Sequence, residues 1–232
     1  MRNLFSYMVT IAIIATIALL PADGYSKPTW RLYDDFESDS IDEDRWNVLA
    51  ISGSIDIDTE KGMAKFVHYT PPEEPDKVNF LIFDMTPGQL RKIKGIRVTV
   101  TVEEYTGYPL VGIGAYISKL EEDLYFYDYL YIQPGSQKIS CGLPLFCLPA
   151  PPVIVGSLFY GEFGDPGEIS GNTFTITIMF SQKSMTYEVS GLGTINRELS
   201  QKLDPTDDYF RILATLGIGS AVVYFDDVYI LQ

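Results

Sequence analysis

Two segments decide the fold: Leu32-Tyr-Asp-Asp-Phe-Glu-Ser-Asp-Ser-Ile-Asp-Glu-Asp-Arg-Trp46 near the start of the chain and Val222-Val-Tyr-Phe-Asp-Asp-Val-Tyr-Ile-Leu231 at its end. The second has the apolar alternation of a β-strand, broken by the adjacent carboxylates Asp226 and Asp227. Short alternating runs separated by Gly/Pro turns fill the chain between them. We therefore predict that the two ends pair and close a β-sandwich.

Strand patterns dominate the chain, and only residues 86–93 and 196–203 resemble short helices. Turns are expected at residues 60–62, 181–184 and 216–220. Many short strands without a βαβ rhythm predict a single all-β domain, a two-sheet antiparallel β-sandwich with jelly-roll topology, over residues 25–232. The expected strands cover residues 55–58, 63–68, 79–84, 95–104, 110–118, 124–133, 153–160, 173–181, 185–189, 209–216 and 221–231.

Residues 1–24 have the pattern of a secretory signal peptide, with a basic start at Arg2, an apolar run and small residues before Tyr25. The alternative is an uncleaved membrane anchor, but the apolar run is shorter than the roughly 20 residues of a spanning helix. The mature protein is therefore expected to be secreted or periplasmic, without a membrane span.

The formal net charge is −14. It argues against nucleic acid and anionic membranes as partners, since both favour basic patches. It is compatible with divalent cations and neutral glycans.

The two cysteines, Cys141 and Cys147, enclose a short Pro-containing loop. In an oxidising compartment they are expected to form a disulfide bond. A zinc site is the alternative, but zinc prefers four ligands and the single histidine, His68, lies far away in sequence.

The terminal segments carry a resemblance to a known superfamily. Asp34-Asp-Phe36, the acidic loop before Trp46 and the terminal Phe225-Asp-Asp-Val-Tyr229 resemble the first and last strands of secreted concanavalin A-like (laminin-G-like) lectin and glucanase domains. The resemblance covers about 25 residues at the termini, and a fold alone does not define a function.

Calcium is the cation that the terminal carboxylates suggest. Adjacent strand residues face opposite sides, so either Asp226 or Asp227 is expected to point toward the interior or a sheet rim. Ca²⁺ with carbonyl oxygens would neutralise such a carboxylate. The resemblance implies the same structural Ca²⁺, with Asp35 and the Gly53 region as further contributors; a salt bridge or solvation is the alternative.

A row of tyrosines is the candidate ligand-binding surface. Period-2 geometry puts Tyr125, Tyr127, Tyr129 and Tyr131 on one face of a strand, and Tyr116 on the preceding strand extends the row. Such rings can stack on sugar rings while their hydroxyl groups form hydrogen bonds. The alternative is that these tyrosines only pack a half-buried sheet surface, as tyrosine often does.

No complete catalytic motif is present. Retaining glucanases of this superfamily resemble one another in a Glu-x-Asp-x-Glu strand, and the nearest pattern here is Asp56, Asp58 and Glu60, which reaches into a predicted turn. We interpret it as a solvated or cation-binding strand face, and His68 as structural.

These observations predict a secreted, non-catalytic glycan-binding module that uses the tyrosine row. One alternative is an extracytoplasmic structural or interaction domain that binds another extracellular protein. The other is a glycoside hydrolase or lyase with unusually placed carboxylates.

Overall fold

The computed structural model describes residues 28–50, 53–70, 79–85, 93–118, 125–142, 159–181, 183–199 and 208–232. For residues 49–50, 79–85, 115–118, 125–127 and 208–216 it describes the backbone alone. The predicted signal peptide and Cys147 lie outside the described residues.

The described residues are nearly all in β-strands, as predicted, with one short 3-10 turn at Pro134–Ser136. None of the helices within them is long and apolar enough to cross a membrane. The strands are β1 (Trp30–Asp34), β2 (Trp46–Ala50), β3 (Gly53–Asp58), β4 (Met63–Tyr69), β5 (Asn79–Met85), β6 (Gly95–Ser118), β7 (Tyr125–Gln133), β8 (Lys138–Gly142), β9 (Tyr160–Glu162), β10 (Thr173–Phe180), β11 (Ser184–Val189), β12 (Gly193–Glu198) and β13 (Asp208–Leu231).

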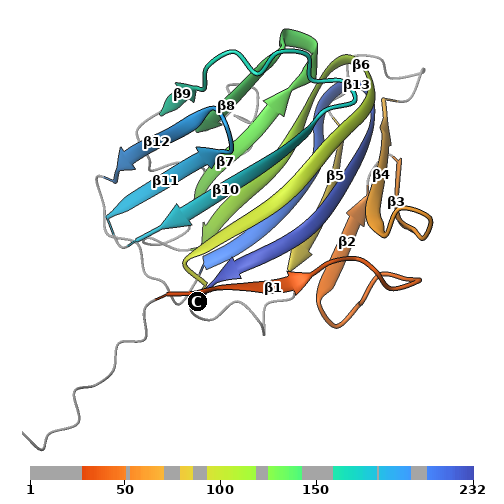
Figure 1. Ribbon diagram of the computed structural model, residues 1–232, viewed down its shortest axis with the longest axis horizontal. Helices are drawn as coiled ribbons and strands as arrows, with labels where there is room; N and C mark the ends of the chain where they lie inside the picture. The colour runs from red at the N-terminus through yellow and green to blue at the C-terminus, as the bar shows by residue number, and fades with distance from the viewer. Residues whose placement is uncertain are drawn as a thin grey trace, which may run out of the picture.

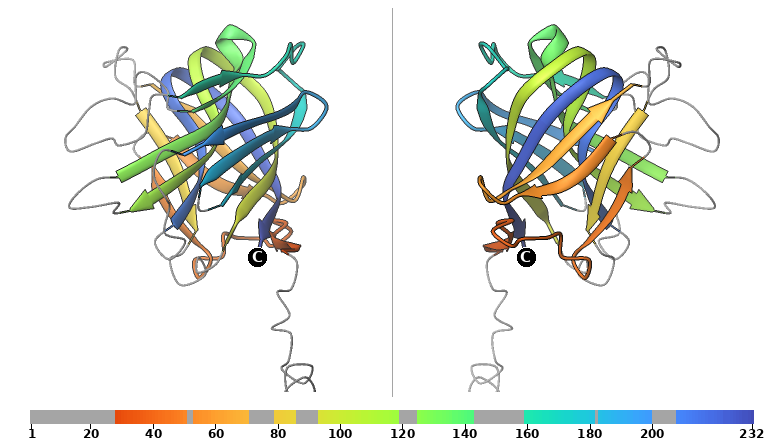
Figure 2. Two further views of the ribbon diagram at one scale, coloured as in Figure 1. Left: turned by 90° about the vertical axis from the view of Figure 1, so that its left-hand side faces the viewer. Right: turned by 90° about the vertical axis from the view of Figure 1, so that its right-hand side faces the viewer.

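The strands form two facing layers that share the long strands β6 and β13 (Figures 1 and 2). In layer A the first part of β6 pairs with β10, and the last part of β13 pairs with β4 and β1. In layer B the second part of β6 pairs with β7, and the first part of β13 pairs with β5. The edges of layer A are formed by β11–β12 and by β3, and those of layer B by β8–β9 and by β2. This architecture is an antiparallel jelly-roll sandwich.

Glycines let β13 bend from one layer to the other without breaking its pairing with β6. Gly217 and Gly219 have φ values of 141° and 123°, and Gly107 on β6 lies in register with Gly219. A Cβ atom on Gly219 would lie 1.9 Å from the carbonyl oxygen of Thr106, so a side chain does not fit there. The predicted hairpin turn at residues 216–220 is therefore wrong.

The helix expected at residues 196–203 is also wrong where the structure describes it, because β12 reaches Glu198 and pairs with β11. Tertiary pairing overrides the weak local helix pattern there. The other two predicted turns are confirmed. Residues 59–62 form the turn between β3 and β4, and the Ser181 amide donates to the Ser184 carbonyl (2.8 Å) between β10 and β11.

The hydrophobic core lies between the layers and follows the period-2 alternation of the strands. Leu130 and Ile132 of β7, for example, are fully buried against the core. Its other fully buried members include Ala64, Phe66, Ile96, Val98, Val100, Val102, Val111, Ile113, Ile139, Ile176, Ile178, Met185, Tyr187, Val223, Phe225 and Val228.

The predicted pairing of the chain ends is confirmed. Trp30 lies opposite Leu231, and Leu32 lies opposite Tyr229 on the antiparallel strands β1 and β13. The first described strand is thus held in layer A by the last one (Figure 1).

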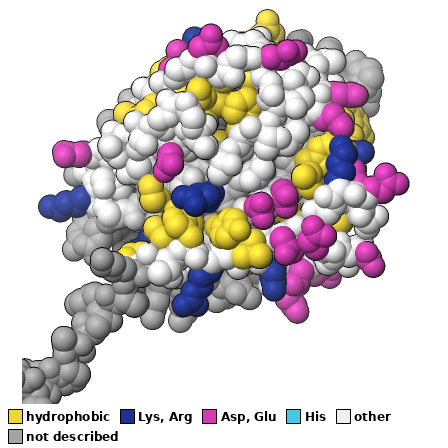
Figure 3. Space-filling model, viewed as in Figure 1, with side chains coloured by type: hydrophobic (Ala, Val, Ile, Leu, Met, Phe, Trp, Pro, Cys, Tyr) yellow, Lys and Arg dark blue, Asp and Glu magenta, His cyan; other side chains and the backbone are white. Residues whose placement is uncertain are grey.

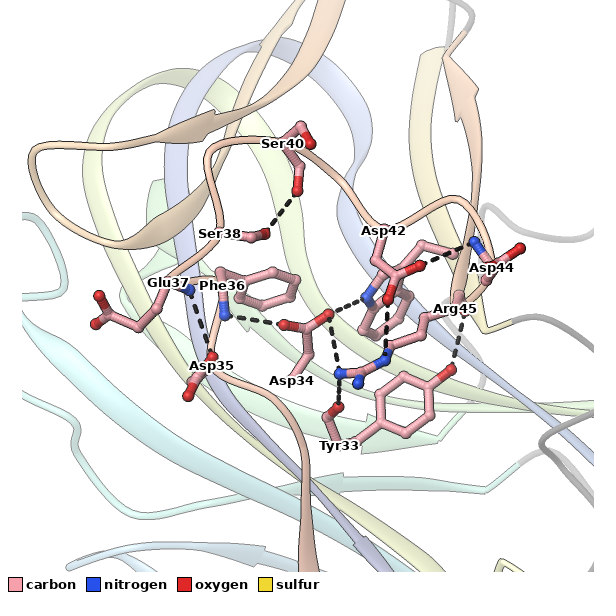
Figure 4. A network of polar contacts seen from close by, with 11 residues as sticks. Tyr33, Asp34, Asp35, Phe36, Glu37, Ser38, Ser40, Asp42, Asp44 and Arg45 are labelled. Atoms are coloured by element: carbon pink, nitrogen blue, oxygen red, sulfur yellow. Dashed lines mark hydrogen bonds and ion pairs between the residues drawn. The ribbon is translucent and has the colours of Figure 1, made fainter.

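The acidic loop after β1 is organised around the buried side chain of Trp46, which is 2% exposed. Asp34 accepts hydrogen bonds from the Phe36 amide (3.0 Å) and from the indole nitrogen of Trp46 (2.7 Å). Arg45 donates to the Tyr33 carbonyl (2.6 Å) and is paired with Asp42 (3.1 Å; Figure 4). The motif that suggested the superfamily is therefore a structural frame, in which Asp34 holds the loop and the Trp46 ring together.

Candidate functional site

Strand β7 separates two chemical environments. Leu130 and Ile132 belong to the core, whereas Tyr129 and Tyr131 alternate with them and lie outside the core cluster. The two tyrosines therefore share the outer face of layer B, as the sequence predicts. The side chains of Tyr116, Tyr125 and Tyr127 are outside the described part of the structure, although the backbones of Tyr116 and Tyr127 are directly paired.

Glycines on β6 form the surface beside these tyrosines. Gly114 lies in register with Tyr129, and Gly112 lies in register with Tyr131. A Cβ atom on Gly114 would lie 2.5 Å from the Tyr129 ring, so that ring covers the β6 backbone. Tyr129 is 9% exposed and Tyr131 is 3% exposed. The prediction of one shared face thus holds for these two residues, but both rings are largely covered.

A polar cluster adjoins the tyrosines at the β8–β9 edge. Ser140 lies opposite Tyr131 on one side and Glu162 on the other. The Tyr160 hydroxyl donates to Glu162 (2.7 Å) and lies 3.2 Å from the Ser140 hydroxyl. Lys138 pairs with Glu162 (2.6 Å), and this hydrogen bond holds the pKa of Glu162 below its usual range. The outer face of layer B therefore combines aromatic rings, hydroxyl groups and a surface ion pair.

The interior contains an ion pair that the sequence reasoning missed. Asp128 of β7 is fully buried and pairs with Arg197 of β12, so the pair connects the two layers. Burial raises the pKa of Asp128 to about 6, while the Arg197 guanidinium and a hydrogen bond with Tyr187 oppose that shift. Asp128 interrupts the apolar series on the inner face of its strand, and that interruption was the available signal. The pair lies between the layers, so its evident role is to connect them.

The candidate catalytic carboxylates do not form a paired site. Asp56 and Glu60 are exposed, and the Asp58 carboxylate accepts the Glu60 and Lys61 amides (3.2 Å each) in the β3–β4 turn. Glycoside hydrolysis usually requires two carboxyl groups that face each other across the substrate. The exposure of Asp56 and Glu60 agrees with our interpretation of a solvated or cation-binding strand face.

The terminal carboxylates lie near two acids of the loop after β1. Burial raises the pKa of Asp226, and the charges of Asp227, Glu37 and Asp35 raise it further. Figure 3 shows acidic side chains together on the side of the molecule where this loop lies. Asp227 is exposed, and its amide donates to the Asp226 carboxylate (2.7 Å).

Gly53 is not brought to these acids. It lies in register with His68, which lies opposite Ala221, five residues before Asp226 on β13. Within the described residues, no group of three or more acidic, His or Cys side chains is arranged to hold a metal ion. The predicted ligand set is thus only partly assembled, and calcium binding stays a prediction.

Cys141 and His68 are both buried. Cys141 is a free thiol here, and burial raises its pKa to about 12. Because Cys147 is outside the described residues, the predicted disulfide is not confirmed.

His68 is 1% exposed, and burial lowers its pKa to about 4, in agreement with the structural role predicted for it.

Several solved structures share this jelly-roll fold. The structure is similar to an endo-β-galactosidase from Clostridium perfringens that releases GlcNAcα1-4Gal (TM-score 0.63, 8% identity, 89% of this chain and 63% of that chain). It is also similar to a Bacillus licheniformis β-glucanase (TM-score 0.61, 8% identity, 90% of this chain and 99% of that chain). A third similar structure is a laminarinase from Flavobacterium sp. UMI-01 (TM-score 0.58, 10% identity, 87% of this chain and 100% of that chain).

These likenesses establish the shared fold, because every identity is far too low to carry an activity. The chain spans less than two thirds of the length of the endo-β-galactosidase. No family model and no curated protein sequence matches the chain.

Proposed function

We propose that this protein is a secreted, non-catalytic glycan-binding module that binds sugar on the outer face of layer B. The observation that carries the proposal is the position of Tyr129 and Tyr131 on that face, beside the polar Ser140. Aromatic rings can stack on the apolar face of a sugar while neighbouring hydroxyl groups bond its own hydroxyls. The fold supports the proposal, because the similar structures include enzymes named for their action on glycans.

The low exposure of both rings defines what binding requires. With Tyr131 only 3% exposed, a sugar would contact ring edges and hydroxyl groups unless the covering groups move. We therefore expect the affinity to be modest, because moving the covering groups opposes association.

Binding should first be measured on a glycan array, with calcium and with a chelator. Selected oligosaccharides should then be titrated into the protein and into the Tyr129→Ala and Tyr131→Ala variants. We expect both variants to bind at least about tenfold more weakly, since lost aromatic contact and a lost hydrogen bond each contribute about 1 kcal/mol. Tyr69→Ala is a matched control, because Tyr69 is half exposed on β4 of layer A.

Thermal denaturation of each variant separates lost contacts from lost folding. Unchanged glycan binding in both folded layer B variants would exclude this face as the site. Product release from any bound oligosaccharide would contradict the non-catalytic part of the proposal and favour a glycoside hydrolase or lyase.

An interaction with an extracellular protein is the second candidate, and one surface feature favours it. Tyr108 and Ile218 lie opposite each other where β6 and β13 bend, and they are 72% and 39% exposed. Exposed apolar side chains of this kind can contact a protein partner. This candidate would be supported if the unmodified protein binds no glycan but binds an extracellular protein, and if the Tyr108→Ala variant no longer binds that protein.

A further inference from the structure

Tyr160 on the edge strand β9 is 54% exposed, whereas Tyr129 and Tyr131, whose side chains the structure also describes, are 9% and 3% exposed. Its strand neighbour Gly161 faces the core: a Cβ atom there would lie 3.0 Å from the Cys141 sulfur and 3.1 Å from Ile195. Since side chains alternate along a strand, Tyr160 and Glu162 face the opposite side. Tyr160 therefore lies on the same face as Tyr129.

The register joins the two rings across a glycine. Tyr129 lies opposite Gly142, and Gly142 lies opposite Tyr160. Gly142 has a φ of 111°, and a Cβ atom there would lie 2.0 Å from the Phe159 carbonyl oxygen, so this position excludes a side chain. Tyr129 and Tyr160 are therefore two strand spacings apart, about 10 Å, with no side chain between them.

The contacts of its hydroxyl group hold the Tyr160 ring in place. That group donates to Glu162 (2.7 Å) and lies 3.2 Å from the Ser140 hydroxyl, while Glu162 also binds Lys138. An aromatic ring that is fixed before binding loses little conformational freedom when a ligand stacks on it. The exposed ring is thus a preorganised platform, unlike the covered rings of Tyr129 and Tyr131.

The charge of this edge indicates the ligand class. Lys138 and Glu162 neutralise each other, so the surroundings of Tyr160 present hydroxyl, carboxylate and ammonium groups without a net positive charge. The whole chain is strongly acidic, with a net charge of −14. Polyanionic sugars are therefore disfavoured here by repulsion from the chain as a whole, whereas uncharged sugar hydroxyls can bond to both members of the ion pair.

We propose that Tyr160 is the outer subsite for a neutral oligosaccharide, stacking on a sugar unit beyond the one that contacts Tyr129. This inference rests on the proposed glycan-binding function and adds a position, a ligand class and a minimum ligand length. A ligand must span the Gly142 gap to contact both rings, so Tyr160 should contribute more to the binding of a hexasaccharide than to that of a disaccharide.

The test is calorimetric titration of the full chain with neutral β-glucan and galactan hexasaccharides, their disaccharides, and an alginate hexasaccharide as the anionic probe. We expect Tyr160→Ala to weaken neutral hexasaccharide binding about tenfold and to leave disaccharide binding within about twofold. Tyr160→Phe keeps the ring and loses its hydroxyl anchors, so it should weaken hexasaccharide binding by about two- to threefold. Tyr69→Ala serves as the exposed-tyrosine control.

The outcomes separate the two proposals. Hexasaccharide binding that Tyr131→Ala weakens and Tyr160→Ala leaves unchanged would overturn the Tyr160 subsite and leave the proposed function intact. Tighter binding of the alginate probe would overturn the ligand class. Absence of binding by the unmodified protein to every neutral and anionic probe would overturn both proposals.

Discussion

The two faces of layer B use similar residue types for opposite purposes. On the inner face, Asp128 and Arg197 form an ion pair with Asp128 fully buried and Arg197 6% exposed. On the outer face, Glu162 and Lys138 form an ion pair whose side chains are 40% and 49% exposed. The inner pair connects two sheets, whereas the outer pair orients the Tyr160 ring at the surface. Changes on the inner face should therefore alter stability, and changes on the outer face should alter binding.

The largest effect is expected for Arg197→Met, which leaves the Asp128 carboxylate buried without its cationic partner. Removing one member of a buried ion pair usually costs about 3–5 kcal/mol of unfolding free energy. Urea denaturation at pH 7.4 measures this loss. The control is Arg97→Met on the outer face of layer A, where Arg97 is partly buried over Trp30, and we expect a loss of about 1 kcal/mol. Equal losses in the two variants would remove the contrast between inner and outer charges.

The pH dependence of stability should also report on Asp128. Burial raises its pKa in the folded protein to about 6, from an ordinary 3.8, so the folded state binds the proton more tightly than the unfolded state does. The contribution of Asp128 protonation to the free energy of unfolding is present below about pH 4 and is lost as the pH rises through about 6. Its amplitude is about 2–3 kcal/mol.

Asp128→Asn should remove this component from a series of denaturation curves between pH 4 and 7. The remaining pH dependence of the free energy of unfolding should include a contribution from His68, whose pKa is lowered to about 4. Its contribution has the opposite sign: it is present above about pH 6.5 and is lost as the pH falls toward 4. Identical pH profiles for the variant and the unmodified protein would contradict the raised pKa of Asp128.

On the outer face, Tyr131→Phe should reduce glycan affinity by about three- to tenfold, because one hydroxyl group is lost from the proposed site. The free energy of unfolding should change by only about 1 kcal/mol, the usual net contribution of one hydroxyl hydrogen bond, since the ring itself is kept. Parallel titration and urea denaturation measure the two quantities. A large loss of stability with unchanged affinity would assign Tyr131 to the structural role.

Calcium is expected to have the smallest effect. If Asp226 and its acidic neighbours bind Ca²⁺, the melting temperature should rise by a few degrees in millimolar CaCl₂ and return after chelation. Asp226→Asn should abolish the rise, whereas Asp56→Asn, on the exposed face of β3, should preserve it. An equal rise with MgCl₂ would indicate general screening of the acidic chain. No rise with CaCl₂ would contradict the predicted site.

The terminal motifs were informative because their signals are local. The alternation in residues 222–231 predicts a strand, and the loop from Asp34 to Trp46 carries its own hydrogen-bond partners within twelve residues. The glycines at 217 and 219 gave a misleading signal. A glycine-rich segment predicts a turn, but here continuous pairing with β6 keeps the chain in one bent strand. Only contacts between distant residues distinguish the two outcomes.

The sequence by itself determined the all-β class and the alternation of Tyr129 and Tyr131 with core residues, because both follow from a two-residue period. The strand patterns at the two termini suggested that the ends pair, and the register of β1 with β13 confirmed it. Tertiary structure decided which charges lie between the sheets and which rings remain exposed. Arg197 meets Asp128 across 69 residues of chain, and Tyr160 joins the face of Tyr129 only through the β8–β9 register. Both depend on how layers pack and strands align, and burial then determines whether a carboxylate stabilises the interior or a tyrosine ring is available to a ligand.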